Sequence, residues 1–191
     1  MQSNQIKFIQ LNRYIHIYRV EGLNNWLQSE KDLITEESKG PTKEGLCNFN
    51  TTSELINEGF HSLMMDLTLK YYVVGENQWD MGNHTFDPRP MIYYQTKENF
   101  TSLFHNHYDH TTITATTYID PLDKEHGGGL ELFFHDKYRP IIYPEPDCIY
   151  VFPSWVLHRP LPHSIDVPRL CINWGFNCSV RPIHKLTGDR W

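Results

Sequence analysis

The sequence predicts a mainly β domain with supporting helices near its N-terminus. From about residue 78 to residue 182, short β-branched and aromatic segments alternate with Pro, Gly, Asp and Asn. Such segments, at a spacing of roughly 10–15 residues, are typical of a sandwich or barrel. Residues 1–77 have a more polar and partly helical pattern. The 191 residues therefore predict a single domain in which 1–77 form an α/β support, 78–182 form the β core and 183–191 form a tail.

The N-terminal part is predicted to hold one strand and two helical segments. Residues 6–20 carry β-branched and aromatic residues in rough alternation, which favours a strand. Residues 23–45 are polar and contain a Gly-Pro break, so we expect a short helix followed by a loop. Residues 50–53 offer helix N-cap side chains, and apolar residues recur at helical spacing within 54–73. That segment is expected to form an amphipathic helix that packs against the sheet.

Six short segments are predicted as strands of the β core. Each is rich in β-branched or aromatic residues, and residues that favour turns separate one from the next. The segments are MIYYQ (91–95), TTITATTYID (111–120), GLELFFHD (129–136), PIIYP (140–144), CIYVFPSW (148–155) and RLCINWGF (169–176).

The composition argues against several classes of protein. Seventeen Lys and Arg against 23 Asp and Glu give a formal charge of −6, which disfavours nucleic-acid binding, since phosphate neutralisation needs clustered basic residues. No apolar run approaches the roughly 20 residues of a membrane helix. The N-terminus has no signal-peptide pattern, so we expect a soluble cytoplasmic protein whose four cysteines stay reduced. The oligomeric state is left open.

Three separated features of the predicted core point to a metal centre. His107 and Asp109 stand two residues apart, and in an extended strand such residues point to the same side. His158 ends an apolar strand, and Arg169 opens the next one. Two histidines and a carboxylate on one face form the facial triad of non-heme Fe(II) oxygenases. An arginine on the following strand can clamp a carboxylate group.

The pairing of the first two ligands has an alternative. His105 and His107 have the same spacing as His107 and Asp109. If His105 were the first ligand, Asp109 would lie off the metal. We prefer His107 with Asp109, because a carboxylate helps to balance the charge of a ferrous ion.

With these motifs in this order, the sequence resembles the 2-oxoglutarate- and Fe(II)-dependent oxygenases, with closest similarity to the prolyl-hydroxylase-like branch and to uncharacterised bacterial and phage members. The resemblance covers roughly residues 91–180. It implies a double-stranded β-helix, a jelly-roll or cupin-like barrel whose open end holds the metal. The stretches that carry it are HNHYDH (105–110), TATTYID (114–120), GGGLELF (127–133), VFPSWVLH (151–158) and RLCINW (169–174).

The resemblance also implies roles for single residues. His107, Asp109 and His158 would be the iron ligands, Arg169 would pair with the distal carboxylate of 2-oxoglutarate, and Tyr118 would support the same carboxylate. The cofactors would be Fe(II), 2-oxoglutarate and O2, with ascorbate in support. Many members have Arg-x-Ser where this chain has Arg169-Leu170-Cys171, so a thiol replaces a hydroxyl that binds the co-substrate.

The activity implied is hydroxylation of an amino-acid, peptidyl or small-molecule substrate, with release of succinate and CO2. Two other interpretations stay open at this point. One is a cupin-like metalloenzyme that does not use 2-oxoglutarate, and the other is a non-catalytic β-sandwich binding module.

Overall fold

The computed structural model describes residues 6–11, 14–38, 58–59, 61–67, 79–86, 91–95, 97, 103–109, 111–134 and 138–182. Its helices are α1 (Leu23–Gln28), α2 (Lys31–Ser38), α3 (His61–Met65) and the short 3-10 helix η3 (Lys124–His126). Its strands are β1 (Ile6–Gln10), β2 (His16–Val20), β3 (Trp79–Phe86), β4 (Met91–Gln95), β5 (Ile113–Ile119), β6 (Leu130–Phe133), β7 (Ile141–Ile142), β8 (Cys148–Pro153), β9 (Leu157–Pro160) and β10 (Arg169–Pro182).

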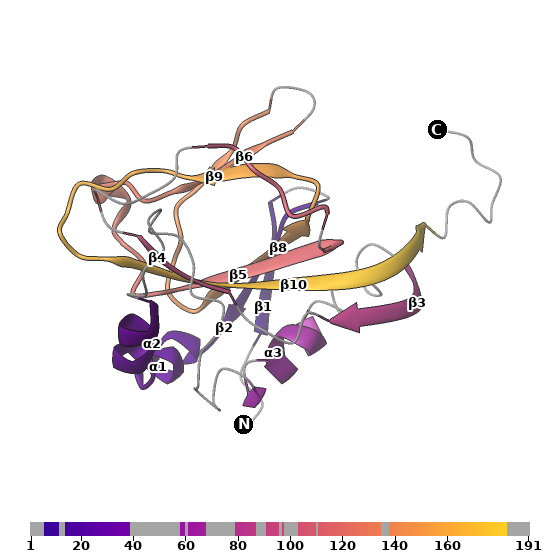
Figure 1. Cartoon of the computed structure of the whole chain (residues 1–191), viewed down its shortest axis with the longest axis horizontal. Coiled ribbons are helices and arrows are strands. Elements are labelled where there is room, and N and C mark those ends of the chain that lie inside the picture. The colour runs from indigo at the N-terminus through magenta and orange to yellow at the C-terminus, as the bar shows by residue number, and fades with distance from the viewer. Residues whose placement is uncertain are drawn as a thin grey trace.

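The strands form two antiparallel sheets, a larger and a smaller one. The larger sheet has the order β1-β2-β8-β5-β10-β3, with β4 also paired to β10. The smaller sheet has the order β7-β6-β9. In Figure 1 the smaller sheet lies above the larger one, and the helices lie below the larger one. The prediction of a mainly β chain with supporting helices is confirmed.

Side chains alternate between the two faces of the larger sheet, as its period of two requires. Along β5, Ile113 and Ala115 pack with the helices, whereas Tyr118 packs with the smaller sheet. The same alternation holds in β8 and in β10, where Leu170 and Ile172 belong to the helix-side core. This leaves alternate residues of each central strand to face the space between the two sheets.

The helices cover the outer face of the larger sheet with apolar side chains. Buried residues of α1, α2 and the α3 region join one cluster with the sheet: Leu23, Leu27, Ile34, Met64 and Leu67. The predicted amphipathic helix thus packs on the sheet where it is described, although α3 spans only five residues. Residues 54–57, 60 and 68–73 of this segment lie outside the described residues. None of the helices in the described part of the chain combines the length and the apolar character needed to cross a bilayer.

The N-terminal segment differs from its prediction in two ways. The described residues of this segment form two antiparallel strands, β1 and β2, instead of one strand, and β2 also pairs with β8. The expected single short helix after residue 23 is two helices, α1 and α2. Strand alternation looks the same on both sides of a hairpin turn, so periodicity alone does not separate one strand from two.

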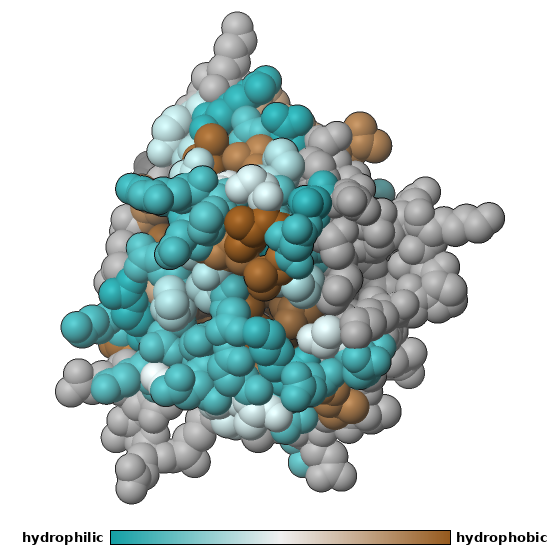
Figure 2. All heavy atoms as spheres, turned by 90° about the vertical axis from the view of Figure 1, so that its left-hand side faces the viewer, coloured by the Kyte–Doolittle hydropathy of each residue, from teal (hydrophilic) through white to brown (hydrophobic). Residues whose placement is uncertain are grey.

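Figure 2 shows the end of the molecule that is on the left of Figure 1. A patch of hydrophobic side chains lies near its centre, and hydrophilic side chains surround the patch on the described surface.

Gly175 marks a close approach between β10 and the segment before β5. A methyl group at this position would overlap the side-chain methyl of buried Thr111. We expect Gly175→Ala to lower the free energy of unfolding by about 1–3 kcal/mol, because overpacking a closed core forces its neighbours to move. Chemical denaturation measures the loss. Thr111→Ser removes the overlapping methyl and keeps the hydroxyl, so it should recover part of the loss in the double variant. An equal loss in both backgrounds would contradict the predicted overlap.

Candidate functional site

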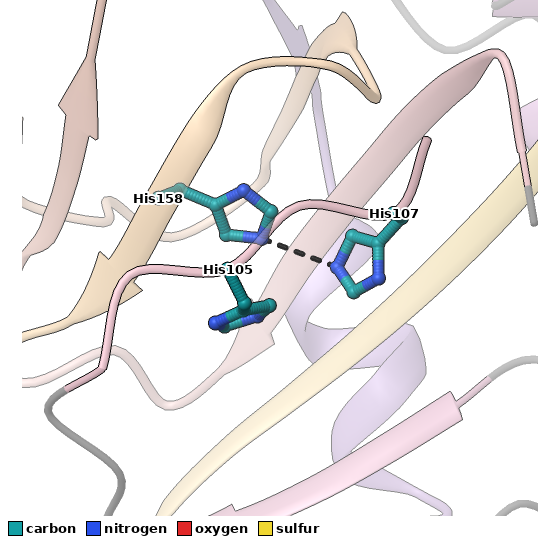
Figure 3. Close-up of side chains that lie close together, drawn as sticks. All are labelled: His105, His107 and His158. Atoms are coloured by element: carbon teal, nitrogen blue, oxygen red, sulfur yellow. Dashed lines mark hydrogen bonds between the residues drawn. The ribbon is translucent and has the colours of Figure 1, made fainter. Parts of the chain in front are cut away.

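Three histidines from two distant segments lie together between the sheets. His158 is on β9, and its backbone exchanges two hydrogen bonds with His105, at 3.0 and 2.8 Å. The His107 amide donates to the carbonyl of Ser154 at 3.0 Å, in the connection between β8 and β9. Backbone pairing therefore fixes the 105–107 segment alongside β9. It brings the three side chains to one place, as Figure 3 shows.

The three rings are close enough to share one ion. Their candidate ligand atoms all lie within 4.8 Å of one another. The Nε2 atoms of His107 and His158 are 3.2 Å apart, joined by the dashed line in Figure 3. Two nitrogens that bind one ion at about 2.1 Å and at about a right angle lie roughly 3 Å apart, so this spacing fits a shared metal ion.

Backbone contacts orient two of the rings. The Nδ1 atom of His158 lies 2.9 Å from the carbonyl oxygen of Val156. A carbonyl only accepts hydrogen bonds, so the proton of the neutral ring is on Nδ1, which leaves the lone pair of Nε2 for a metal. The Nδ1 atom of His105 faces the Leu103 carbonyl at 3.3 Å in the same manner.

The surroundings keep these rings neutral. Burial, with smaller contributions from the neighbouring His105 and His107 rings, lowers the pKa of His158 to about 3. Burial also lowers the pKa of His105, although the contact with the Leu103 carbonyl opposes this shift. Neutral imidazole is the form that binds a metal ion, so near pH 7 both rings are ready to do so.

Asp109 lies apart from this group. The chain turns at Tyr108 and Asp109, and the Thr111 amide donates to the His107 carbonyl at 2.8 Å across the turn. The Asp109 side chain is exposed, and it is not among the residues that meet at the cluster. The expectation that His107 and Asp109 share one side assumed an extended strand, whereas the chain turns directly after His107.

A buried hydroxyl network supports the backbone at His107. Ser154, which is completely buried, is 2.8 Å from the hydroxyl of Thr111 and 2.8 Å from that of Thr114. The Thr111 hydroxyl also lies 3.3 Å from the His107 carbonyl. These contacts tie the turn after His107 to β5 and to the end of β8, and they restrict where the His107 ring can lie.

Arg169 occupies a second polar region on the same side of the larger sheet. Its guanidinium donates to Gln95 Oε1 at 2.7 Å and to the Tyr118 hydroxyl at 2.8 Å. The residue is 3% exposed, and its Nε has no hydrogen-bond partner in the described part of the chain. Gln95 and Tyr118 are neutral, and no described carboxylate forms an ion pair with Arg169. A buried cation without a counter-charge favours the binding of an anion.

Tyr118 stays protonated beside this cation. Burial raises the pKa of its phenol, and the Arg169 guanidinium only partly opposes the shift. Its oxygen accepts the hydrogen bond from Arg169, and its hydroxyl also has a side-chain hydrogen bond with Cys171. Arg169 and Tyr118, both predicted from the sequence, are therefore brought together by the pairing of β5 with β10.

One pocket joins the arginine to the histidine cluster. It encloses about 470 Å³ that no atom fills, part of it open to solvent, and both His158 and Arg169 line it. Arg169, Cys171 and Asn173 follow one another along the inward face of β10, and Asn173 lies 3.5 Å from the His107 ring. Four strand residues span roughly 13 Å, so the pocket can hold a short molecule that reaches from the arginine to the cluster.

Two polar residues of this pocket are not among those predicted from the sequence. Gln95 is the register partner of Arg169 on β4, and Asn173 is four residues beyond Arg169 on β10. The period of a strand places Asn173 on the inward face, so this signal was present in RLCINW. The role of Gln95 depends on the pairing of β4 with β10, which no local pattern predicts. Cys171, the thiol in place of the usual serine, lies 2.9 Å from the Thr116 hydroxyl.

Comparison of sequences identifies no relatives: no protein-family model matches the chain, and no curated protein sequence is significantly similar to it. Comparison of structures identifies solved proteins with a similar fold. A prolyl-4-hydroxylase from Pseudomonas putida superposes with a TM-score of 0.62 at 16% identity, over 92% of this chain and 94% of that one.

Two further solved structures are similar. One is a prolyl hydroxylase from Trichoplax adhaerens in complex with a hypoxia-inducible-factor peptide fragment, with a TM-score of 0.57 at 16% identity over 99% of this chain and 89% of that one. The other is the collagen prolyl hydroxylase of Paramecium bursaria chlorella virus 1 in a 2-oxoglutarate complex, with a TM-score of 0.57 at 12% identity over 88% and 97%. At these identities the likeness shows the fold, the double-stranded β-helix. The resemblance seen in the sequence is confirmed at that level.

Proposed function

We propose that the protein is an Fe(II)- and 2-oxoglutarate-dependent oxygenase that hydroxylates an amino-acid, peptidyl or small-molecule substrate. The observation that carries the proposal is a single pocket lined by two of three clustered histidines and by a buried arginine that no described carboxylate neutralises. A histidine cluster alone would suit many metal sites, and a buried arginine alone would suit many anions. Together they match a centre that binds both a metal ion and a dianionic co-substrate.

His107 and His158 are the two ligands that we propose from both the sequence and the geometry. For the third, we propose His105 instead of Asp109. The His105 ring centroid lies 4.4 Å from that of His158 and 5.2 Å from that of His107, whereas Asp109 is an exposed turn residue. Three neutral nitrogen donors suit a first-row divalent ion such as Fe(II).

Arg169 and Tyr118 are proposed to hold the distal carboxylate of 2-oxoglutarate. The guanidinium provides the positive charge and the Tyr118 hydroxyl donates a hydrogen bond, while Gln95 keeps the guanidinium in place. The Nε–H group of Arg169 is also buried, and no residue in the described part of the chain accepts its hydrogen bond. A bound carboxylate could provide that acceptor. Cys171 contributes only a weak donor at the position of the usual serine, because burial raises the pKa of its thiol and keeps it protonated.

When bound, Fe(II) and 2-oxoglutarate supply the oxidising chemistry that converts O2 and a substrate C–H group to a hydroxyl group, with succinate and CO2 as co-products. The chain itself binds and orients these groups. The neutral imidazoles offer lone pairs, Arg169 fixes the far end of the co-substrate, and apolar pocket residues such as Phe152 and Leu130 exclude water.

A peptidyl substrate is the proposal that the comparisons favour. One structural neighbour contains a peptide fragment, and the neighbours named above are prolyl hydroxylases. The test is a succinate-release assay with Fe(II), ascorbate, 2-oxoglutarate and a panel of amino acids and proline-containing peptides. Succinate that depends on Fe(II) and on one class of substrate supports the proposal. Metal-dependent turnover without 2-oxoglutarate would indicate a cupin-like enzyme, and no stoichiometric metal uptake would indicate a binding module.

Separate alanine variants of His105 and Asp109 decide the third ligand. We expect His105→Ala to weaken Fe(II) binding by about a hundredfold. Loss of a group that only orients a ligand already lowers metal affinity by about ten- to a hundredfold, and loss of the ligand itself should lower it at least as much. Asp109→Ala should bind Fe(II) like the original protein, since the exposed carboxylate lies outside the cluster. Anaerobic Fe(II) titration measures both affinities. The reverse pattern would restore the ligand set His107, Asp109 and His158 that the sequence predicts.

A further inference from the structure

The Asn173 carboxamide is a buried polar group that the proposed chemistry has not used. Its side chain lines the pocket, and the residue is 6% exposed. Its Oδ1 atom has no hydrogen-bond partner in the described part of the chain. Its Nδ2 atom lies 3.5 Å from Nε2 of His107, at the limit of a hydrogen bond. A buried carbonyl oxygen without a hydrogen-bond partner destabilises the fold. A ligand that donates a hydrogen bond to this oxygen would remove that cost, which would favour binding of the ligand.

A metal ion on His107 would change what Asn173 can do. The lone pair of Nε2 would then point to the ion, and the Asn173 amide could no longer donate to that ring nitrogen. The N–H group would lose its contact with that ring nitrogen, and the carbonyl oxygen already has no partner in the described part of the chain. The carboxamide therefore offers one acceptor and one donor at this place.

We propose that Asn173 is a positioning residue of the metal centre, whose carboxamide hydrogen-bonds the water, hydroxyl or N–H group that occupies an open position of the ion held by His107. The inference rests on the metal site proposed above. In this proposal Asn173 orients the group bound at the metal end of the pocket. Arg169 holds the co-substrate carboxylate at the other end of the pocket.

The position of Asn173 in β10 supports this role. It is on the same inward row as Arg169 and Cys171, and it pairs in register with Thr116 of β5. The Thr116 hydroxyl already has partners, Cys171 Sγ at 2.9 Å and the Ile172 carbonyl at 3.3 Å. Of these two facing polar residues, Asn173 is thus the one with an unused acceptor near the histidines, as far as the described residues extend.

The test uses the full chain with Co(II), which reports its ligand environment through visible absorption bands. We expect Asn173→Leu to shift these bands and to weaken Co(II) binding by about tenfold, the usual effect of losing a group that hydrogen-bonds a metal ligand. Asn173→Asp should tighten Co(II) binding by about tenfold, because it adds a negative charge beside the ion. Asn25→Asp is the matched control, since it adds the same charge at an exposed position of α1 and should leave binding unchanged.

Thermal unfolding of the metal-free chain separates this role from simple packing. Leucine has a shape similar to that of asparagine and lacks the buried oxygen that has no hydrogen-bond partner in the described residues. Asn173→Leu should therefore unfold at the same temperature as the original protein or at a higher one. A lower melting temperature with unchanged Co(II) bands would assign Asn173 to packing and overturn the inference. Original-strength binding and spectra in both Asn173 variants would also overturn it. If the original protein takes up no Co(II), both the proposed metal site and the role of Asn173 are contradicted. If it takes up Co(II) but the Asn173 variants behave like it, only the role of Asn173 is contradicted.

Discussion

His158→Ala is expected to reduce the affinity for Fe(II) or Co(II) by about a hundredfold or more. His158 is the most buried ring of the cluster and lies 3.2 Å from His107. A bound ion at about 100 times its dissociation constant stabilises a fold by about 2.7 kcal/mol. Adding metal should therefore raise the melting temperature of the original protein and leave that of His158→Ala unchanged. Metal titration followed by thermal unfolding measures both effects.

His126→Ala is the matched control for this variant. His126 belongs to η3, outside the cluster, so its loss should change neither metal affinity nor the metal-induced shift. The metal-free His158→Ala chain is expected to fold, because the backbone bonds between His105 and residue 158 do not depend on the side chain. Full metal affinity in His158→Ala would remove the basis of the proposed function.

Arg169→Met is expected to raise the KM for 2-oxoglutarate by about a hundredfold while leaving metal binding intact. The variant keeps most of the side-chain volume and removes the charge. Losing one or two charge-assisted hydrogen bonds weakens binding by about 3 kcal/mol, which corresponds to about a hundredfold. Succinate release at varied 2-oxoglutarate concentrations measures KM, and a Co(II) spectrum checks the metal site in the same preparation.

Arg19→Met serves as the control for Arg169→Met. Arg19 pairs with Glu145 at the surface, away from the pocket, so KM for 2-oxoglutarate should stay at its original value. An unchanged KM in Arg169→Met would contradict the role proposed for Arg169. Turnover that does not depend on 2-oxoglutarate in the original protein would favour the cupin-like alternative.

The core strands and the arginine region follow from local patterns. Alternation in TTITATTYID and RLCINWGF predicts which residues face the helices and which face the smaller sheet. The same alternation accounts for the inward positions of Tyr118, Cys171 and Arg169. Arg169 and Tyr118 come from segments about fifty residues apart, and their hydrogen bond at 2.8 Å requires only that these two strands be neighbours.

Which residues join His107 and His158 in the cluster could not be predicted from local sequence patterns. His105, His107 and Asp109 are equally spaced, so the i, i+2 rule supports either pair of neighbours. The choice between His105 and Asp109 depends on where the chain turns, and the turn is at residues 108–109. The hydrogen bond from Thr111 to the His107 carbonyl and the contacts of Ser154 turn the chain after His107. Ser154 lies 47 positions beyond His107 in the numbering, so no local pattern contains this information.

Local sequence patterns predict the β class of the core, the inward rows of its strands, and the residues whose chemistry suits a metal ion and an acidic co-substrate. These properties depend on side-chain type and on a period of two, which are local. Three other features follow from tertiary contacts. The strands β1 and β2 pair within the larger sheet, His105 meets His107 and His158, and Gln95 and Asn173 line the pocket. Each of these depends on hydrogen bonds or contacts between segments far apart in the chain, and a period read along one strand carries no information about its partner.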